Sequence, residues 1–257
     1  MIALEDHLRA RRTEGRKILA PFVTGGLGSQ WLDVVRACID NGADAIEVGI
    51  PFSDPMMDGV TIQEASQRAL ELGATPEGVV RALADLDAPV PIVAMTYYNP
   101  VHHMGHERWA QLCADNGIAG TIIPDLPFDE GADWIAAADA QGLANVLLVA
   151  PSTTDARLRE IVARSRGFVY TVSRMGVTGE RANVDASTTS TTARVRAATD
   201  LPVLVGFGIS TSEQARTVGG EADGVIVASA LMRRVLDGAQ VSEIGEVVAE
   251  FRAALDH

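Results

Sequence analysis

The stretch AIEVGIPFSDPMMDG, residues 45–59, joins a short apolar strand to a polar loop and the start of a helix, which is the repeating unit of an α/β fold. Side chains alternate between the two faces of a strand, so Ile46 and Val48 share one face and Glu47 lies on the other, between small neighbours. Such a carboxylate is either an active-site group whose pKa burial raises, or a structural glutamate paired with an arginine. The stretch therefore predicts a βα unit and a candidate acid or base at Glu47.

Apolar and β-branched runs of strand length recur along the whole chain. Eight of them are visible, at residues 18–24, 45–49, 91–96, 120–123, 145–150, 168–172, 202–207 and 224–228. Segments of helical period lie between most of these runs, for example at 31–39 and 156–162. Eight strand–helix units in 257 residues predict an α/β protein with a single (β/α)8 TIM barrel as its one domain, residues 1–257. A doubly wound sheet is the alternative.

Two connections are longer than a minimal barrel requires. Two helices are expected between the second and third strands, near 61–72 and 76–86, and a glycine-containing polar loop at 174–183 follows the sixth strand. Both connections follow the C-terminal ends of strands, where barrel enzymes have their active sites. We also expect an extra helix before the first strand and another near the eighth.

Composition narrows the classes of function. The formal net charge of −13 disfavours binding to nucleic acid and to anionic membranes, which depends on clustered Lys and Arg. The N-terminal residues lack the basic and apolar regions of a signal peptide, so we expect a cytoplasmic protein. Cys38 and Cys113 lack the spacing of a metal site and are expected to be reduced thiols.

Residues 45–63 closely resemble the signature of the tryptophan synthase alpha subunit family. Further matches to the family cover its first strand, fourth strand, sixth strand with mobile loop, and phosphate turn, at residues 20–24, 125–127, 170–179 and 206–210. The resemblance implies a carbon–carbon lyase of L-tryptophan biosynthesis that cleaves indole-3-glycerol phosphate to indole and D-glyceraldehyde 3-phosphate. It also implies a beta-subunit partner in an α2β2 heterotetramer, with pyridoxal phosphate in the beta subunit and no cofactor in this chain.

This retro-aldol cleavage requires an acid that protonates indole C3. Glu47 is the candidate, because burial favours its protonated form. A fixed carboxylate beside the indole nitrogen N1 would stabilise the positive charge that develops there, and Asp58 suits this role. Asp54 is the alternative, although its position between Ser53 and Pro55 also suits a residue that organises its own turn.

The resemblance assigns further residues to the substrate site. Phe22, Tyr170 and Thr178 would line the pocket or its lid, and Thr178 would join the closed loop to Asp58. The phosphate is expected after the seventh and eighth strands, where backbone N–H groups can bind an anion without a basic cluster. The residues expected around it are Gly179, Gly206, Phe207, Gly208, Ala228 and Ser229.

Other aldolase mechanisms lack suitable residues in the sequence. Lys17 is the only lysine, and it precedes the first strand, at the end of the barrel opposite the expected site. His102, His103 and His106 cluster, but we interpret them as solvated loop histidines and expect no metal.

Some positions depart from the family's pattern. Val60 replaces a usual proline, Met56 and Met57 replace a smaller pair, and residues 25–28 lack the usual turn after the first strand. Ala228 stands where a phosphate-binding glycine is typical. The alternatives to an alpha subunit are a stand-alone lyase that releases indole, another phosphate-binding barrel such as an isomerase or synthase, and a non-catalytic scaffold that activates its partner.

Overall fold

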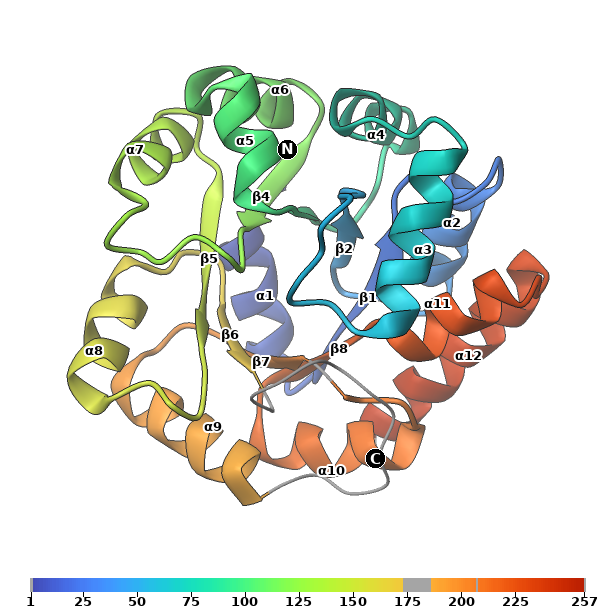
Figure 1. Cartoon of the computed structure of the whole chain (residues 1–257). Helices are drawn as coiled ribbons and strands as arrows, with labels where there is room; N and C mark the ends of the chain where they lie inside the picture. The colour runs from blue at the N-terminus through green and yellow to red at the C-terminus, as the bar shows by residue number, and fades with distance from the viewer. Residues whose placement is uncertain (1, 173–185, 207, 257) are drawn as a thin grey trace.

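The computed structural model describes residues 2–172, 186–206 and 208–256, and eight parallel strands in them close into a barrel (Figure 1). The strands pair in chain order, and the last pairs with the first. The predicted TIM barrel is thus confirmed, and the doubly wound alternative is excluded by the closure. The strands are β1 (Ile18–Thr24), β2 (Ile46–Gly49), β3 (Ile92–Met95), β4 (Ile118–Ile122), β5 (Ala144–Val149), β6 (Val169–Val172), β7 (Val203–Gly206) and β8 (Gly224–Val227).

Helices surround the barrel in the expected places. The extra N-terminal helix is α1, the β2–β3 connection carries α3 and α4 followed by the short 3-10 helix η1 (Ala84–Leu86), and β8 is followed by both α11 and α12. The α-helices of the described residues are α1 (Leu4–Thr13), α2 (Trp31–Asp40), α3 (Val60–Glu71), α4 (Pro76–Leu83), α5 (Tyr98–Met104), α6 (His106–Asp115), α7 (Ala132–Ala140), α8 (Asp155–Arg164), α9 (Ala186–Ala198), α10 (Ser212–Glu221), α11 (Ser229–Leu236) and α12 (Val241–Leu255).

The β3–β4 connection differs from the prediction. His102 and His103 lie in α5 and His106 begins α6, so the predicted histidine loop is wrong. The two helices are separated at Gly105, whose φ of 92° is a left-handed conformation that glycine adopts without strain. The polar residues around Gly105 suggested a longer loop, but the chain departs from helical structure only at this glycine.

Helix α1 closes the N-terminal end of the barrel. Leu4 and Leu8 are buried, and a Cβ added to Gly120 or Gly167 would meet the Leu4 side chain at 3.1 or 2.5 Å. Figure 1 shows α1 behind the ring of strands, with the β2–α3 loop in front. The open end of the barrel is therefore the end at which the C-termini of the strands lie.

The register of the first strands places two candidate residues side by side. Phe22 of β1 pairs with Glu47 of β2, and Glu47 pairs with Val93 of β3. Paired residues of neighbouring parallel strands point to the same face, so Phe22 and Glu47 enter the barrel together.

Of the helices that the structure describes, none is both long enough and apolar enough to cross a membrane.

Candidate active site

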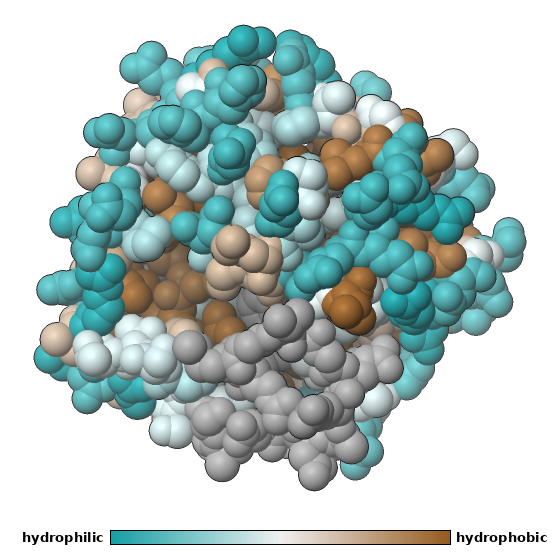
Figure 2. All heavy atoms as spheres, viewed as in Figure 1, coloured by the Kyte–Doolittle hydropathy of each residue, from teal (hydrophilic) through white to brown (hydrophobic). Residues whose placement is uncertain are grey.

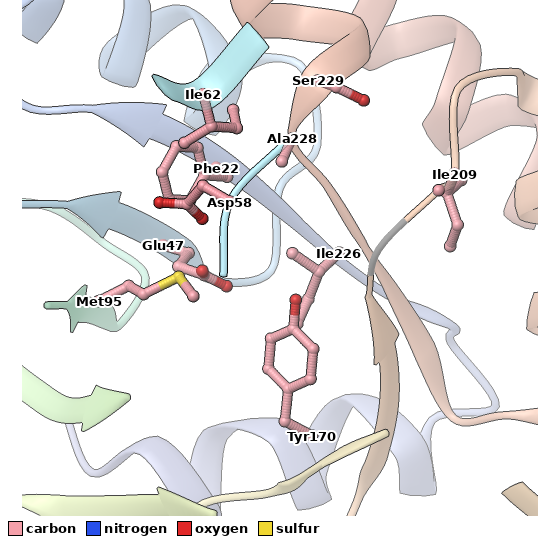
Figure 3. A pocket seen from close by; sticks show the side chains of 11 residues that line it. Phe22, Glu47, Asp58, Ile62, Met95, Tyr170, Ile209, Ile226, Ala228 and Ser229 are labelled. Carbon is pink, nitrogen blue, oxygen red and sulfur yellow. The ribbon is translucent and has the colours of Figure 1, made fainter. Parts of the chain in front are cut away.

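A cavity opens at the C-terminal end of the strands. Its volume is about 450 Å³, including the space that is open to solvent. Most of its wall is apolar, and two carboxylates stand on one side (Figure 3). Five sequence-predicted residues other than the carboxylates lie in it, together with four that the sequence did not reveal. The lining residues are Phe22, Glu47, Asp58, Ile62, Met95, Tyr170, Gly208, Ile209, Ile226, Ala228 and Ser229.

Glu47 points into this cavity from the middle of β2 (Figure 3). It is only 3% exposed, and its Oε2 has no hydrogen-bond partner among the described residues. Burial raises the pKa of Glu47 to about 8, and the charge of Asp58 adds to this rise. Among the described residues that line the cavity there is no arginine, which favours the active-site interpretation of Glu47 over a structural Glu–Arg pair. Glu47 therefore carries a proton at neutral pH.

Asp58 faces the same cavity from the loop before α3 (Figure 3). Burial raises the pKa of Asp58 to about 6, while a hydrogen bond from Tyr97 acts in the opposite direction. The loop is held from behind, because the side chain of Gln63 donates to the Asp58 carbonyl oxygen at 2.8 Å. Near pH 7 the cavity thus combines a protonated Glu47 with an ionised Asp58, one acid and one anion.

Asp54 occupies a different environment from Asp58. It is exposed, and Ser53 Oγ donates to its Oδ2 at 2.6 Å. The Asp54 carbonyl oxygen accepts from Met56 N at 2.9 Å, which closes a tight turn. Asp54 is not among the cavity-lining residues. The geometry favours Asp58 as the site carboxylate and assigns Asp54 to the turn.

Tyr97 is a site residue that the sequence analysis missed. Its hydroxyl accepts from Met57 N at 2.9 Å and forms the hydrogen bond with Asp58. Its ring stacks on Phe52, with the ring centroids 5.2 Å apart. Tyr97 lies two residues after the end of β3, and this position at the C-terminal end of a barrel strand was the available signal. Tyr97 therefore ties the β2–α3 loop to the next strand.

Aromatic and aliphatic side chains form the apolar wall of the cavity. Phe22 of β1 and Tyr170 of β6 line the cavity. Burial raises the pKa of Tyr170, and the charge of Glu47 adds to this effect, so its hydroxyl stays neutral. The four lining residues that sequence reasoning missed are Ile62, Met95, Ile209 and Ile226. Only Met95 and Ile226 lie within strands, and an aliphatic strand residue carries no signal of its own.

The opposite side of the cavity offers backbone groups to an anion. Gly208 has a φ of 80°, which favours glycine, and Ser229 is the first residue of α11. Ala228 precedes this helix and makes no side-chain cap, so its first two amides, of Ser229 and Ala230, have no capping side chain, whereas Leu231 N donates to the Ala228 carbonyl oxygen at 3.1 Å. Figure 3 shows Ser229 and Ile209 on this side, across the cavity from Glu47.

The structure changes the interpretation of Gly206 and of the start of α10 in the predicted phosphate turn. Gly206 is absent from the lining, and a Cβ at this position would collide with Tyr170, so its small size makes room for that ring. The start of α10 is capped from within, because Gln214 Oε1 accepts from Ser210 N at 2.8 Å and from Thr211 N at 3.2 Å. The predicted site residues Thr178, Gly179 and Phe207 lie outside the described residues.

Comparison with known proteins identifies the family. A sequence model of the family described as tryptophan synthase alpha chain matches residues 8–255. The tryptophan synthase alpha chain of Streptomyces coelicolor is 47% identical over 243 residues, which cover 91% of this chain and 88% of that protein. The chain belongs to the tryptophan synthase alpha chain family. The predicted lyase function in tryptophan biosynthesis is confirmed with it, since this family cleaves indole-3-glycerol phosphate.

Solved structures of tryptophan synthase alpha chains have the same fold. A Mycobacterium tuberculosis tryptophan synthase chain superposes with a TM-score of 0.91 at 37% identity, covering 98% of this chain and 97% of that one. The Legionella pneumophila alpha subunit gives a TM-score of 0.90 at 29% identity, with 100% and 99% covered. The similarity therefore extends over the whole barrel and its extra helices.

The competing aldolase residues lie away from the cavity of this alpha chain. Lys17 donates from Nζ to the Ala222 carbonyl oxygen at 2.8 Å, before β1 and β8 begin. His106 shares a hydrogen bond of 2.9 Å with the Tyr98 hydroxyl. Among the described residues, no three His, Cys, Asp or Glu side chains form a group that could hold a metal ion.

Proposed function

We propose that Glu47 is the acid that protonates indole C3 and that Asp58 is the anion that stabilises the indole nitrogen during cleavage. The observation that carries this proposal is the pair itself: two carboxylates in one apolar cavity, with the pKa of one raised to about 8 and that of the other to about 6. Such a separation assigns the proton donor and the anion near neutral pH.

The proton balance of the reaction extends the role of Glu47. Protonation of C3 gives an indolenine, and cleavage of the bond from C3 to the side chain then restores the aromatic ring. The side-chain hydroxyl must lose its proton as it becomes the aldehyde. Glu47 is ionised after the first step and can accept this proton, which returns it to its starting state. One carboxyl group thus serves both steps without net consumption of protons.

The phosphate of the substrate is proposed to bind at Gly208 and at the start of α11. Available amides at the N-terminus of this eight-residue helix favour an anion, and Ser229 adds a hydroxyl. This arrangement needs no lysine, in agreement with a chain whose only lysine lies at the other end of the barrel. Thr178, Gly179 and Phe207 complete the proposed substrate site on the resemblance alone.

A beta-subunit partner in an α2β2 complex is proposed for the face around the β2–α3 loop. Met56, Met57 and Val60 are 76%, 38% and 66% exposed, although they are large apolar residues. Figure 2 shows apolar atoms near the centre of the face onto which the barrel opens, among a largely hydrophilic surround. Exposed apolar groups on a polar surface are typical of protein interaction sites. Pyridoxal phosphate is assigned to that partner, and this chain is proposed to act without a cofactor.

We further infer that residues 1–257 act as one domain in the cytoplasm. Leu4 of α1 and Phe251 of α12 belong to one hydrophobic core with the strands, which supports a single cooperative unit. Cys38 and Cys113 are buried free thiols, as expected in a reducing compartment. A single unfolding transition observed by two independent probes would support the one-domain assignment, and two separated transitions would contradict it.

Indole release tests the function. The purified chain is assayed with indole-3-glycerol phosphate, alone and with a saturating beta subunit from the same source. We expect slow release by the chain alone and acceleration in the complex, because docking would order the Asp58 loop. Equal rates together with no complex in analytical ultracentrifugation would support the stand-alone lyase. Turnover of another sugar phosphate without indole would indicate a different barrel enzyme.

A further inference from the structure

A polar contact joins α3 to α11 at the rim of the barrel. Arg233 of α11 donates from Nη2 to Thr61 Oγ1 of α3 at 3.1 Å, and the same nitrogen lies 3.0 Å from Glu64 Oε2. Thr61 is buried, whereas Glu64 is exposed. The two hydrogen-bonded residues are 172 positions apart in the chain, so the contact exists only in the folded barrel.

Each end of this contact lies about one helical turn from a residue of the candidate site. Thr61 follows Asp58 by three positions, and Arg233 follows Ser229 by four. In an α-helix, residues four apart lie on the same face, which places Arg233 one turn behind the proposed phosphate end of α11. The contact therefore connects the two elements that hold the two ends of the substrate.

The segment between Asp58 and Thr61 is short and internally bonded. Gly59 accepts through its carbonyl oxygen from Ile62 N at 3.0 Å and from Gln63 N at 2.9 Å. The Gln63 side chain donates to the Asp58 carbonyl oxygen at 2.8 Å. A displacement of the first turn of α3 would therefore move the Asp58 backbone with it.

We propose that Arg233 is a positioning residue for the lyase reaction, which holds Asp58 at a fixed distance from the phosphate-binding end of α11. This inference rests on the proposed function, because it requires Asp58 at the indole nitrogen and the phosphate near Ser229. Arg233 acts through Thr61, since burial and the Tyr97 hydroxyl account for the pKa of Asp58. The distance matters because both ends of the substrate must be engaged when C3 is protonated.

The expected signature is a loss in kcat with little change in KM. Phosphate and ring contacts remain when Arg233 is altered, so binding of the ground state persists, while Asp58 is less well placed as charge develops at N1. Misplacement by about 1 Å can cost up to about 10²-fold in rate. A looser α3 start should displace Asp58 by less than this, and we expect a loss of about fivefold.

The test uses Arg233→Met, Thr61→Val and the double variant. Arg233→Met removes the donors and keeps an apolar stem, and Thr61→Val removes the acceptor at nearly constant shape. We expect each single variant to lose about fivefold in kcat, with KM within about twofold, and the double variant to lose no more than either single one. Thr61→Ser keeps the hydroxyl and should retain the wild-type rate.

Arg68→Met is the matched control. Arg68 spans the same two helices, with Nη1 lying 3.5 Å from the Leu236 carbonyl oxygen, but it lies two turns farther along α3. We expect its kcat to stay at the wild-type value. The positioning role is overturned if Arg68→Met loses as much as Arg233→Met, if the two single losses add, or if Thr61→Ser is as slow as Thr61→Val.

Asp58→Asn, measured in parallel, separates this inference from the proposed function. Wild-type turnover of Asp58→Asn would refute the proposed function itself. A strong loss in Asp58→Asn combined with wild-type kcat in both Arg233→Met and Thr61→Val would refute only the positioning role. Thermal unfolding of all variants checks that each loss arises in a folded protein.

Discussion

Two buried carboxylates, three residues apart in the sequence, show how the two ends of this barrel differ. Asp44 and Glu47 are each 3% exposed. Asp44 lies before β2 and accepts from Arg16 Nε at 2.7 Å, from Arg252 Nη1 at 3.0 Å and from Leu19 N at 3.0 Å. Glu47 lies within β2 and has a carboxylate oxygen without a partner among the described residues.

The comparison distinguishes Asp44, a carboxylate that stabilises the fold, from Glu47, a carboxylate that can donate a proton. Contacts with two arginines and a backbone amide satisfy the Asp44 carboxylate, and Arg252 joins the N-terminal end of the barrel to α12 through it. Burial, reinforced by the charge of Asp58, raises the pKa of Glu47 to about 8 and leaves a proton available in the cavity. Asp44 and Glu47 are equally buried, but the fold places arginines beside Asp44. Asp44 therefore stabilises the fold, whereas Glu47 can take part in proton transfer.

The largest expected effect is on turnover in Glu47→Gln. Glutamine is nearly isosteric but cannot deliver a proton to C3, so kcat for indole release should fall by about 10³-fold. Circular dichroism should remain that of the wild type, because Glu47 Oε2 has no hydrogen-bond partner among the described residues that the substitution could remove. Retention of more than about a tenth of the wild-type rate would remove Glu47 from the acid role.

Asp44→Asn should leave the chemistry intact but destabilise the fold by about 3 kcal/mol, because Arg252 loses the carboxylate of a buried pair. Urea unfolding monitored by fluorescence measures the change. Asp33→Asn is a suitable control, since Asp33 pairs with Arg36 on the exposed surface and should change stability by less than about 1 kcal/mol. An equal loss in both variants would mean that burial of the Asp44 pair is unimportant.

Asp58→Asn should lower kcat by about 10²-fold, because a neutral amide replaces the anion beside the developing charge on the indole ring. Asp54→Asn is the control within the same loop, since Asp54 bonds to Ser53 in its own turn and is exposed. Its loss should be several-fold smaller. The reverse ranking of the two variants in the indole-release assay would show that the loop carboxylates have been assigned the wrong way round.

Taken per pH unit, the smallest expected effect is the pH dependence of stability. Folding raises the pKa of Glu47 from 4.5 to about 8, so the folded state binds a proton that the unfolded state releases. The contribution is present below pH 4.5 and is lost as the pH rises to about 8, by at most about 1.4 kcal/mol per pH unit. Relative to the wild type, Glu47→Gln should therefore gain stability in this window. A parallel dependence of both proteins on pH would contradict the raised pKa.

Much of this architecture could be predicted because its signals are local. Each strand of the barrel coincides within a few residues with an apolar run, since burial on both faces requires such a run wherever a parallel strand forms. Helix α5 and the start of α6 escaped prediction, because the histidines and Gly105 suggested a loop whereas the structure confines the break to Gly105. The resemblance named Phe22 and Tyr170, but nothing local distinguishes Ile226 from any other buried strand residue.

The sequence by itself determined the strand–helix periodicity, the inward face of Glu47 and the choice of Asp54 or Asp58 as its companion. All of these follow from alternation and spacing within one βα unit. Only the tertiary structure decided that Asp58 is buried with Glu47, that Tyr97 bonds to this loop from the next strand, and that Arg233 reaches Thr61. The pKa and the contacts of a side chain depend on which residues surround it, and barrel closure brings these together from distant parts of the chain.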